Sequence, residues 1–394
     1  MQKPYVPREI EPLLTSYLGD FPVVGLTGPR QSGKSTLLRH LLSDTYTYVT
    51  FDDYAVYDLF YADPERFMKT YANNVIFDEA QLAPELFRYI KLAVDNDRSQ
   101  YGKFIVTGSS QFALLEKASE SLAGRIGLLS LSPFVYTELP EESRSQSLYM
   151  GTYPELTLRN FRHADRWYAS YLTTYLEKDV SSLFRIGDMR DFRRFISLLA
   201  ARTSQLLNMS TFARELGVAV STIKKWISIL EASYIIFLLP TYHANRGKRI
   251  VKSPKVYFLD TGLAAYLTAS ASEEAAQRGP LAGALFENYV ISDVYKQLIN
   301  TLPKERLFFY RESSGLEVDL IVTDGHNKVV VEVKNSYTFR SRMTEGIETL
   351  LEEGDRGYLV FKGDERPLAG PIKIVPYTTF LGEELSPLKI DRMV

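Results

Sequence analysis

The stretch VVGLTGPRQSGKSTLL, residues 23–38, decides the fold of the chain. Its apolar start, Val23–Leu26, predicts a buried parallel strand, and Thr36, Leu37 and Leu38 open an amphipathic helix. The turn between them reads G-x-x-x-x-G-K-S. Glycines in such a turn let successive N–H groups and the positive end of the helix dipole face a phosphate. The stretch therefore predicts a P-loop in an α/β fold, with an ordinary glycine-rich turn as the alternative.

The residue types of this loop indicate what each position does. Lys34 supplies a positive charge to the β- and γ-phosphates, and we also count it among the catalytic residues. Ser35 supplies a hydroxyl ligand to Mg²⁺, so ATP and Mg²⁺ are the expected cofactors. The predicted nucleotide-binding residues of the loop are Gly28, Pro29, Arg30, Gln31, Ser32, Gly33, Lys34, Ser35 and Thr36.

Length and composition narrow the class of protein. A chain of 394 residues is longer than the chain that one hydrophobic core usually organises, so we expect two or three domains. Because cysteine is absent, disulfides, thiolate metal sites and cysteine nucleophiles are excluded. The net charge of −2 gives no global basic field, so any nucleic-acid surface must be a local patch. No apolar run approaches the ~18 residues of a membrane span, which predicts a cytoplasmic protein without a membrane partner.

A second buried strand, within NNVIFDEAQ (residues 73–81), ends in two acids, Asp78 and Glu79. Ligands of parallel α/β sheets bind outside the carboxyl ends of the strands. We therefore expect Asp78 to hold the water shell of Mg²⁺ and Glu79 to polarise the attacking water. The alternative is a strand that simply ends in solvated acids.

Two further positions are candidates for the same site. The strand predicted over residues 103–112 ends in small polar residues, and Ser109, Ser110 or Gln111 could sense the γ-phosphate; the alternative is that they cap a following helix, Gln111–Ser119. Of these we assign Ser109 to the nucleotide site. Arg125 could stabilise charge in the transition state, in cis or from a neighbouring subunit, with a surface salt bridge as the alternative.

The order of several motifs resembles a family of prokaryotic AAA+ superfamily ATPases, whose members join an N-terminal ATPase module to a C-terminal domain of uncharacterised function. The resemblance implies ATP binding and hydrolysis, with Lys34, Ser35, Asp78 and Glu79 at motif positions. Because many members of this superfamily form rings, we leave open whether this chain forms a homo-oligomer. The motifs are GPRQSGKSTLL, VIFDEAQ, FIVTGSSQF, SLAGRI, GTYPE, YLTTYLEKDV and PKVYFLDTGLAAYL.

The middle of the chain predicts helices over residues 156–200, as a connector or lid, and then two helices and a strand pair. Ser210 and Ser221 are the expected caps of the two helices, and Gly217 separates them. With strands over residues 234–242 and 248–258, this block resembles a winged helix. Its basic residues predict DNA as a partner, with docking onto protein as the alternative. They are Lys224 and Lys225 on the second helix and Arg246, Lys248, Arg249, Lys252 and Lys255 in the wing.

The last section predicts a helix over residues 281–299 followed by strands over 306–312, 316–324 and 328–336. Alternation along the second strand places Glu317 and Asp319 on one face and Val318, Leu320 and Val322 on the other. In the third strand Glu332 and Lys334 share a face.

These residues resemble the PD-(D/E)xK nuclease fold, in which the carboxylates hold a divalent metal and the lysine orients water. The resemblance implies Asp319, Glu332 and Lys334 as catalytic residues, with Asp319, Glu332 and Glu287 as ligands of Mg²⁺ or Mn²⁺. The alternative is a hairpin whose polar residues face water.

The sequence therefore predicts an α/β chain with a P-loop NTPase parallel sheet and three further segments. They are the ATPase domain (residues 1–150), a helical connector or lid (151–202), a winged helix (203–258) and a nuclease-like α/β domain (259–394). The expected function is ATP binding and hydrolysis by an AAA+-type protein whose C-terminal module binds nucleic acid or a protein partner under nucleotide control. An ATP-regulated, metal-dependent DNA nuclease is the alternative.

Overall fold

The computed structural model describes residues 5–108, 121–174, 189–242, 253–269, 273–301, 306–312, 315–366 and 370–385. The chain divides into two compact units. Unit 1 holds residues 1–134 with two short pieces, Tyr153–Glu155 and Ala232–Tyr234. Unit 2 holds the remainder, from Val135 to Val394. The predicted four-part division stays a prediction.

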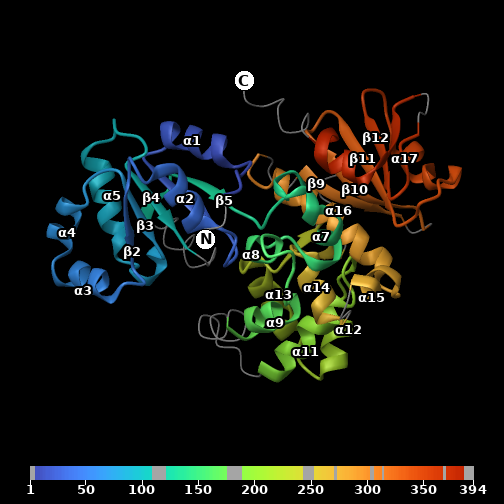
Figure 1. The fold of residues 1–394 in the computed structure, drawn as a ribbon, viewed down its shortest axis with the longest axis horizontal. Coiled ribbons are helices and arrows are strands. Elements are labelled where there is room, and N and C mark those ends of the chain that lie inside the picture. Colours follow the sequence, from blue (N-terminus) through green and yellow to red (C-terminus); the bar gives the residue numbers. More distant parts are fainter. Residues whose placement is uncertain are drawn as a thin grey trace. The chain divides into compact units, whose positions relative to one another are not determined.

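Unit 1 is built on a five-stranded sheet in the order β2-β3-β4-β1-β5 (Figure 1). All four neighbouring pairs run parallel, as predicted for a P-loop fold. The carboxyl ends of the strands therefore lie at one edge, where α/β proteins bind ligands. The strands are β1 (Val23–Thr27), β2 (Thr47–Thr50), β3 (Val75–Asp78), β4 (Phe104–Thr107) and β5 (Ile126–Ser130).

Helices cover both faces of this sheet. On one face Leu14 and Leu37 pack against Val24 and Ile105, and on the other Phe60, Phe87 and their neighbours pack against Phe77. Both faces of β1 and β3 are buried, which explains why these strands are apolar runs without alternation. The helices are α1 (Glu11–Asp20) and α2 (Lys34–Leu42) on the first face and α3 (Tyr54–Ala62), α4 (Pro64–Thr70) and α5 (Leu86–Asn96) on the second, with a 3-10 turn, η1 (Ala80–Leu82), after β3.

The segment after β2 forms two helices, α3 and α4. Asp63 lies between them with φ −153°, and its side chain accepts the N–H of Arg66. Proline disfavours a helical residue before it and is well placed in a first helical turn. Pro64 therefore ends α3 and starts α4.

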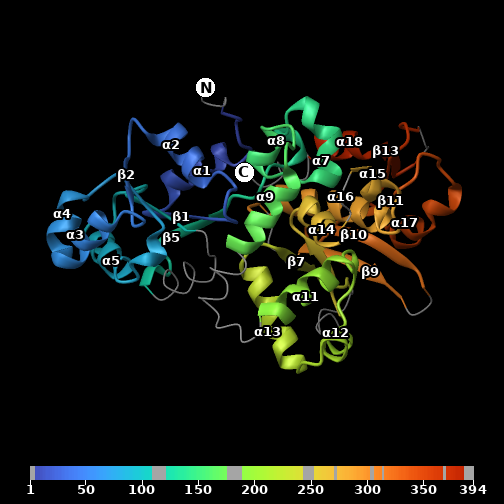
Figure 2. The ribbon, with the colours of Figure 1, turned by 60° about the horizontal axis from the view of Figure 1, so that its bottom comes forward.

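Unit 2 begins with short helices and continues into the two predicted helices of the middle block (Figure 1, Figure 2). Gly217, with φ 70°, ends the first of these helices as predicted. The predicted caps are wrong: Asn208 caps the first helix through Thr211 N, and Ser221 lies inside the second. The elements are η2 (Tyr136–Glu138), η3 (Glu141–Ser143), α7 (Arg144–Met150), α8 (Pro154–Thr157), α9 (Ala164–Tyr171), α11 (Met189–Ala200), α12 (Met209–Leu216) and α13 (Val220–Ala232).

Two strands follow α13, and with β6 (Gln205–Leu206) they form a small sheet in the order β6-β8-β7. Strands β7 (Ile236–Leu239) and β8 (Lys255–Phe258) pair antiparallel, as predicted, but within the described residues both are shorter than the predicted ranges. The predicted turn with Arg246, Lys248, Arg249 and Lys252 lies outside the described residues.

The C-terminal part of unit 2 contains a second five-stranded sheet, in the order β13-β12-β11-β10-β9. Strands β9 to β11 pair antiparallel, whereas β11, β12 and β13 run parallel. Helix α16 packs against β8, β10 and β11 (Figure 2). The elements are α14 (Thr261–Leu267), α15 (Glu273–Arg278), α16 (Ala282–Leu298), β9 (Leu307–Arg311), β10 (Glu317–Thr323), β11 (Lys328–Lys334), η7 (Ser341–Met343), α17 (Glu345–Leu350), β12 (Arg356–Phe361), β13 (Ile372–Pro376), α18 (Tyr377–Thr379) and η8 (Phe380–Glu384).

The prediction that side chains alternate regularly along β10 is wrong at one point. The register with β9 shifts between Val318 and Ile321, and these two residues, three apart, share one hydrophobic cluster. A bulge of this kind changes the direction of the side chains beside it. The predicted sharing of a face by Glu317 and Asp319 still holds, because both contact Lys255.

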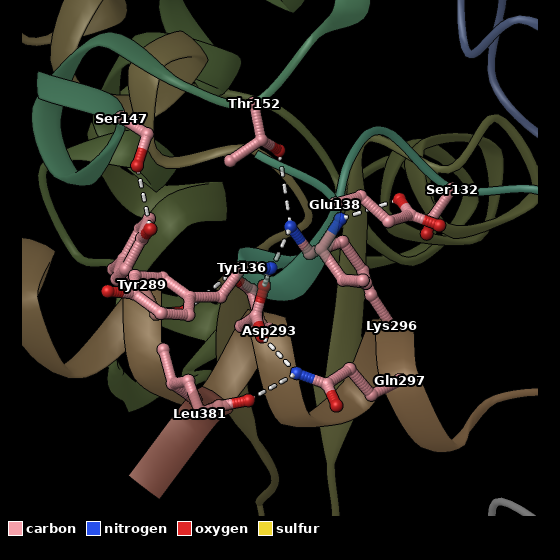
Figure 3. Close-up of polar contacts among 12 residues, drawn as sticks. Ser132, Tyr136, Glu138, Ser147, Thr152, Tyr289, Asp293, Lys296, Gln297 and Leu381 are labelled. Atoms are coloured by element: carbon pink, nitrogen blue, oxygen red, sulfur yellow. Dashed lines mark hydrogen bonds and ion pairs between the residues drawn. The ribbon is translucent and has the colours of Figure 1, made fainter. Parts of the chain in front are cut away.

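Buried polar contacts hold α16 inside unit 2 (Figure 3). Asp293, fully buried, accepts the N–H of Tyr136 at 2.9 Å and the Gln297 amide at 2.6 Å. Lys296 reaches both Asp293, at 3.5 Å, and Thr152 Oγ1, at 3.2 Å. The segment over residues 135–152 is therefore tied to α16 by polar contacts as well as by packing. Within the described residues no helix is long and apolar enough to span a bilayer.

Candidate functional site

The loop between β1 and α2 has the backbone that its sequence predicts. Gly28, Gln31 and Gly33 have φ values of 138°, 62° and 98°. A Cβ on Gly28 would lie 2.1 Å from the carbonyl oxygen of Leu131, so only glycine fits this position. Gly33 caps α2 without a side-chain acceptor, which leaves the first N–H groups of the helix for an anion.

The ammonium of Lys34 lies inside the loop. Its Nζ donates to the carbonyl oxygens of Gly28 and Pro29, both at 2.9 Å, and the residue is 7% exposed. Burial lowers the pKa of Lys34 to about 8, although Glu79 and Asp78 oppose that shift. The lysine therefore lies within the loop that is predicted to surround the phosphates.

Asp78, at the end of β3, is the centre of a hydrogen-bond network. Thr107 Oγ1 donates to its Oδ1 at 2.6 Å, and Ser35 Oγ donates to its Oδ2 at 3.1 Å. The Tyr48 hydroxyl also donates to Oδ2, and burial together with this bond raises the pKa of Tyr48 to about 12. The two residues predicted to serve Mg²⁺, Ser35 and Asp78, therefore lie side by side.

Glu79 has a different orientation because its backbone is left-handed, with φ 50°. This conformation is uncommon outside glycine and is found at functional sites. Its half-buried carboxylate accepts a hydrogen bond from the Gln81 amide, while Asp78 beside it contacts Ser35 and Thr107. The two neighbouring acids thus contact different partners.

Two residues of this site were missed by sequence reasoning. Thr107 is fully buried at the end of β4, and its position at the tip of an apolar strand was the available signal. Arg8 donates to the carbonyl oxygens of Ser32, at 2.8 Å, and Ser132, at 2.7 Å. No local pattern indicates Arg8, because its partners are far along the chain.

The residues present fit a triphosphate with magnesium. The glycines and Lys34 shape the loop, and the buried hydroxyl of Ser32 has no hydrogen-bond partner in the described part of the chain.

Of the other predicted residues, Arg125 forms an ion pair with Asp95, with Nε to Oδ1 at 2.8 Å. Ser109 lies outside the described residues, so its role and that of Arg125 stay predictions.

A second polar cluster, in unit 2, surrounds Lys255 of β8. The Nζ of this lysine lies 2.6 Å from Glu317 Oε1, 2.9 Å from Glu287 Oε1 and 3.2 Å from Asp319 Oδ1. Burial opposes the charge of Lys255, but Tyr257 and these acids raise its pKa well above the ordinary value. The expectation that Lys255 forms part of an exposed basic wing is wrong, because the residue is 2% exposed.

The other predicted members of the cluster come from β11. Glu332 pairs with Lys334 through Oε1, and its Oε2 has no hydrogen-bond partner among the described residues. Burial, followed by the charge of Asp319, raises the pKa of Glu332 to about 8 and that of Glu287 to about 7. The structure thus gathers Glu287, Asp319, Glu332 and Lys334, as the sequence predicts.

The gathered residues do not fit the predicted metal. Within the described residues, no group of three or more histidines and acids is arranged to hold a metal ion. The cation between Glu287 and Asp319 is the Lys255 ammonium. With this ammonium in place, the assignment of Glu287, Asp319 and Glu332 as ligands of Mg²⁺ or Mn²⁺ stays a prediction.

Family models match three successive parts of the chain. Residues 20–140 match the family model described as AAA domain. Residues 141–274 and 282–380 match two domains of unknown function, DUF8612 and DUF4143. The uncharacterized proteins Rv2008c of Mycobacterium tuberculosis and Mb2031c of Mycobacterium bovis are each 33% identical over 362 residues, covering 90% of this chain and 80% of theirs. The chain belongs to the family of these proteins. Its N-terminal unit is a P-loop ATPase domain of the AAA type.

Among solved structures, the Walker-type ATPase PABY2304 of Pyrococcus abyssi is similar with a TM-score of 0.47 and 18% identity, over 67% of this chain and 96% of that one. A RuvB variant of Thermotoga maritima has a TM-score of 0.30 and 15% identity, over 58% of this chain and 88% of that one.

Proposed function

We propose that the family member described here hydrolyses MgATP at the loop of unit 1, with one role for each of four residues. Lys34 binds the β- and γ-phosphates, and Glu79 takes or orients the proton of the attacking water. Ser35 and Asp78 hold the magnesium ion, which neutralises phosphate charge when it is bound. The hydrogen bond between Ser35 and Asp78 carries this proposal, because it brings the ends of two separate motifs together.

Calorimetry and phosphate release test these roles. Lys34→Ala should abolish MgATP binding, whereas Glu79→Gln should bind MgATP and lose at least about 100-fold in turnover. Glu85→Gln is the matched control, because Glu85 is exposed and its side chain caps no helix. Unchanged binding in Lys34→Ala, or normal turnover in Glu79→Gln, would refute the assignment.

For unit 2 we propose binding of nucleic acid under nucleotide control, through the second helix of the middle block. Lys224 and Lys225 of α13 are exposed, while Ile223 and Trp226 are buried. Adjacent exposed lysines on a helix supply the phosphate contacts that such binding needs. Docking onto a protein partner is the other outcome of the test.

The test is fluorescence anisotropy with duplex DNA over a range of salt concentrations, in ATP and in ADP. Replacing Lys224 and Lys225 by Glu should weaken binding and lower the log–log salt slope by about 2. The control carries the same charge change, Arg66→Glu with Lys69→Glu, on exposed residues of α4 in unit 1. Equal affinity of the two double variants contradicts the proposal.

The alternative of a metal-dependent nuclease is less well supported. Its acids are present, but Lys255 forms ion pairs with two of them. Incubating the protein with plasmid DNA and Mg²⁺ or Mn²⁺ tests for nuclease activity. If this cluster cleaves the DNA, cleavage must disappear in an Asp319→Ala, Glu332→Ala double variant.

A further inference from the structure

The acid cluster of unit 2 contains its own cation. Lys255 comes from the small sheet, Glu287 from α16, and Glu317 and Asp319 from β10. An ammonium has three N–H donors, and each of these three acids places an oxygen within 3.2 Å of it. The lysine donates hydrogen bonds to Glu287 and Asp319 and forms an ion pair with Glu317.

The backbone fixes the position of this lysine. Lys255 is in register with Leu206 of β6 on one side and Leu239 of β7 on the other. The Tyr257 hydroxyl, from the same strand, donates to Glu287 Oε1 at 2.7 Å. Because β8 is the central strand of its sheet, the ammonium cannot leave the acids through a simple movement of an edge strand.

A second observation concerns a carboxylate oxygen of Glu332 that is available as a ligand. The Glu332 side chain is 9% exposed, and its Oε2 has no hydrogen-bond partner in the part of the chain that the structure describes. Backbone N–H of Val333 donates to Asp319 Oδ2 at 3.0 Å, which holds that carboxylate at the end of β10. Oxygen donors of this kind suit Mg²⁺ and Mn²⁺.

We infer that Lys255 takes the place of a divalent metal in this cluster, and that replacing Lys255 by an apolar residue converts the cluster into a Mn²⁺ or Mg²⁺ site. In the natural chain the acids then organise unit 2 without metal. This inference goes beyond the proposed function, since it holds whether unit 2 binds nucleic acid or protein.

Titration of EDTA-treated, nucleotide-free full-length protein with Mn²⁺ tests the inference. Lys255→Met should bind one Mn²⁺ at least about tenfold more tightly than the natural chain. Adding Asp319→Asn to Lys255→Met should remove this gain, and both variants keep the same P-loop. Mn²⁺ should also raise the melting temperature of Lys255→Met more than that of the natural chain. A folded Lys255→Met protein without the gain overturns the inference.

A second comparison does not depend on the folding of Lys255→Met. The natural chain and its Asp319→Asn variant should bind Mn²⁺ equally weakly, because the cluster takes no metal in either. Tighter binding in the natural chain, lost on Asp319→Asn, would show that metal displaces the ammonium and would overturn the inference.

Discussion

The Thr107 hydroxyl donates a 2.6 Å hydrogen bond to Oδ1 of Asp78. The two residues end neighbouring parallel strands, with Phe77 in register with Val106 one step before them. This contact occupies one carboxylate oxygen and leaves Oδ2 to Ser35 and Tyr48. The tip of β4 therefore orients the acid that we assign to magnesium.

Thr107→Val should lower the rate of ATP hydrolysis about tenfold, because loss of one hydrogen bond to a buried charge costs about 1.5–3 kcal/mol. Thr107→Ser keeps the hydroxyl and should retain most of the rate. Steady-state phosphate release measures both. Equal rates for the valine and serine variants would contradict an orienting role.

Arg8→Ala should weaken MgATP binding, because the P-loop loses the donor to Ser32 O and the link to Ser132 O. Each lost charged hydrogen bond is worth about 1.5–3 kcal/mol, which corresponds to at least about tenfold in affinity. Arg66→Ala, on an exposed residue of α4, is the control for general loss of charge. Calorimetry that gives both variants the affinity of the natural chain would exclude this role.

Binding of MgATP should take up a proton just above pH 8, because the pKa of Lys34 is lowered to about 8 and phosphate charge favours the ammonium. Affinity should accordingly fall as pH rises through 8. Calorimetry in two buffers of different ionisation heat measures the proton uptake, and equal heats would refute it.

The same pKa shift has an effect on stability whose sign follows from linkage. An unfolded lysine has a pKa of 10.5, so between pH 8 and 10.5 the unfolded chain binds more protons than the folded chain. Stability of nucleotide-free unit 1 should therefore rise with pH across this window, and Lys34→Met should remove the rise. Chemical denaturation of the two proteins at both ends of the window checks it.

Asp293→Ala should destabilise unit 2 by about 3–5 kcal/mol, because it leaves Lys296 buried without its acid and removes the acceptor of Tyr136 N–H. Glu365→Ala, on an exposed acid, is the control and should change little. Urea denaturation followed by circular dichroism measures both. Similar midpoints would show that the network in Figure 3 contributes little.

Local signals made the nucleotide site predictable. Gly28, Lys34 and Asp78 belong to short motifs whose function depends on residues close in sequence, and the strands around them are apolar runs. The contact of Arg8 with Ser132 joins residues that no motif relates, so it could not be predicted.

The acid cluster shows a different limit of prediction from sequence. The strand pattern predicts that Asp319 and Glu332 converge, and the resemblance to the nuclease fold adds Glu287. The sequence does not predict that Lys255, in a basic stretch, turns inward to meet them, since that depends on how the small sheet packs against α16. A basic stretch of sequence that suggests a DNA-binding surface can thus contain a buried lysine that pairs with acids elsewhere in the chain.

Lys255 and its acids also decide how the protein can be dissected. A cut between residues 260 and 282 would leave the ammonium in one fragment and its three carboxylates in the other, so that the buried Lys255 and Asp319 would each lose an ion-pair partner. Neither fragment would retain this electrostatic balance. Domain-deletion studies of this family should therefore keep the region from Val135 onward in one piece, and should expect both of its sheets to unfold together.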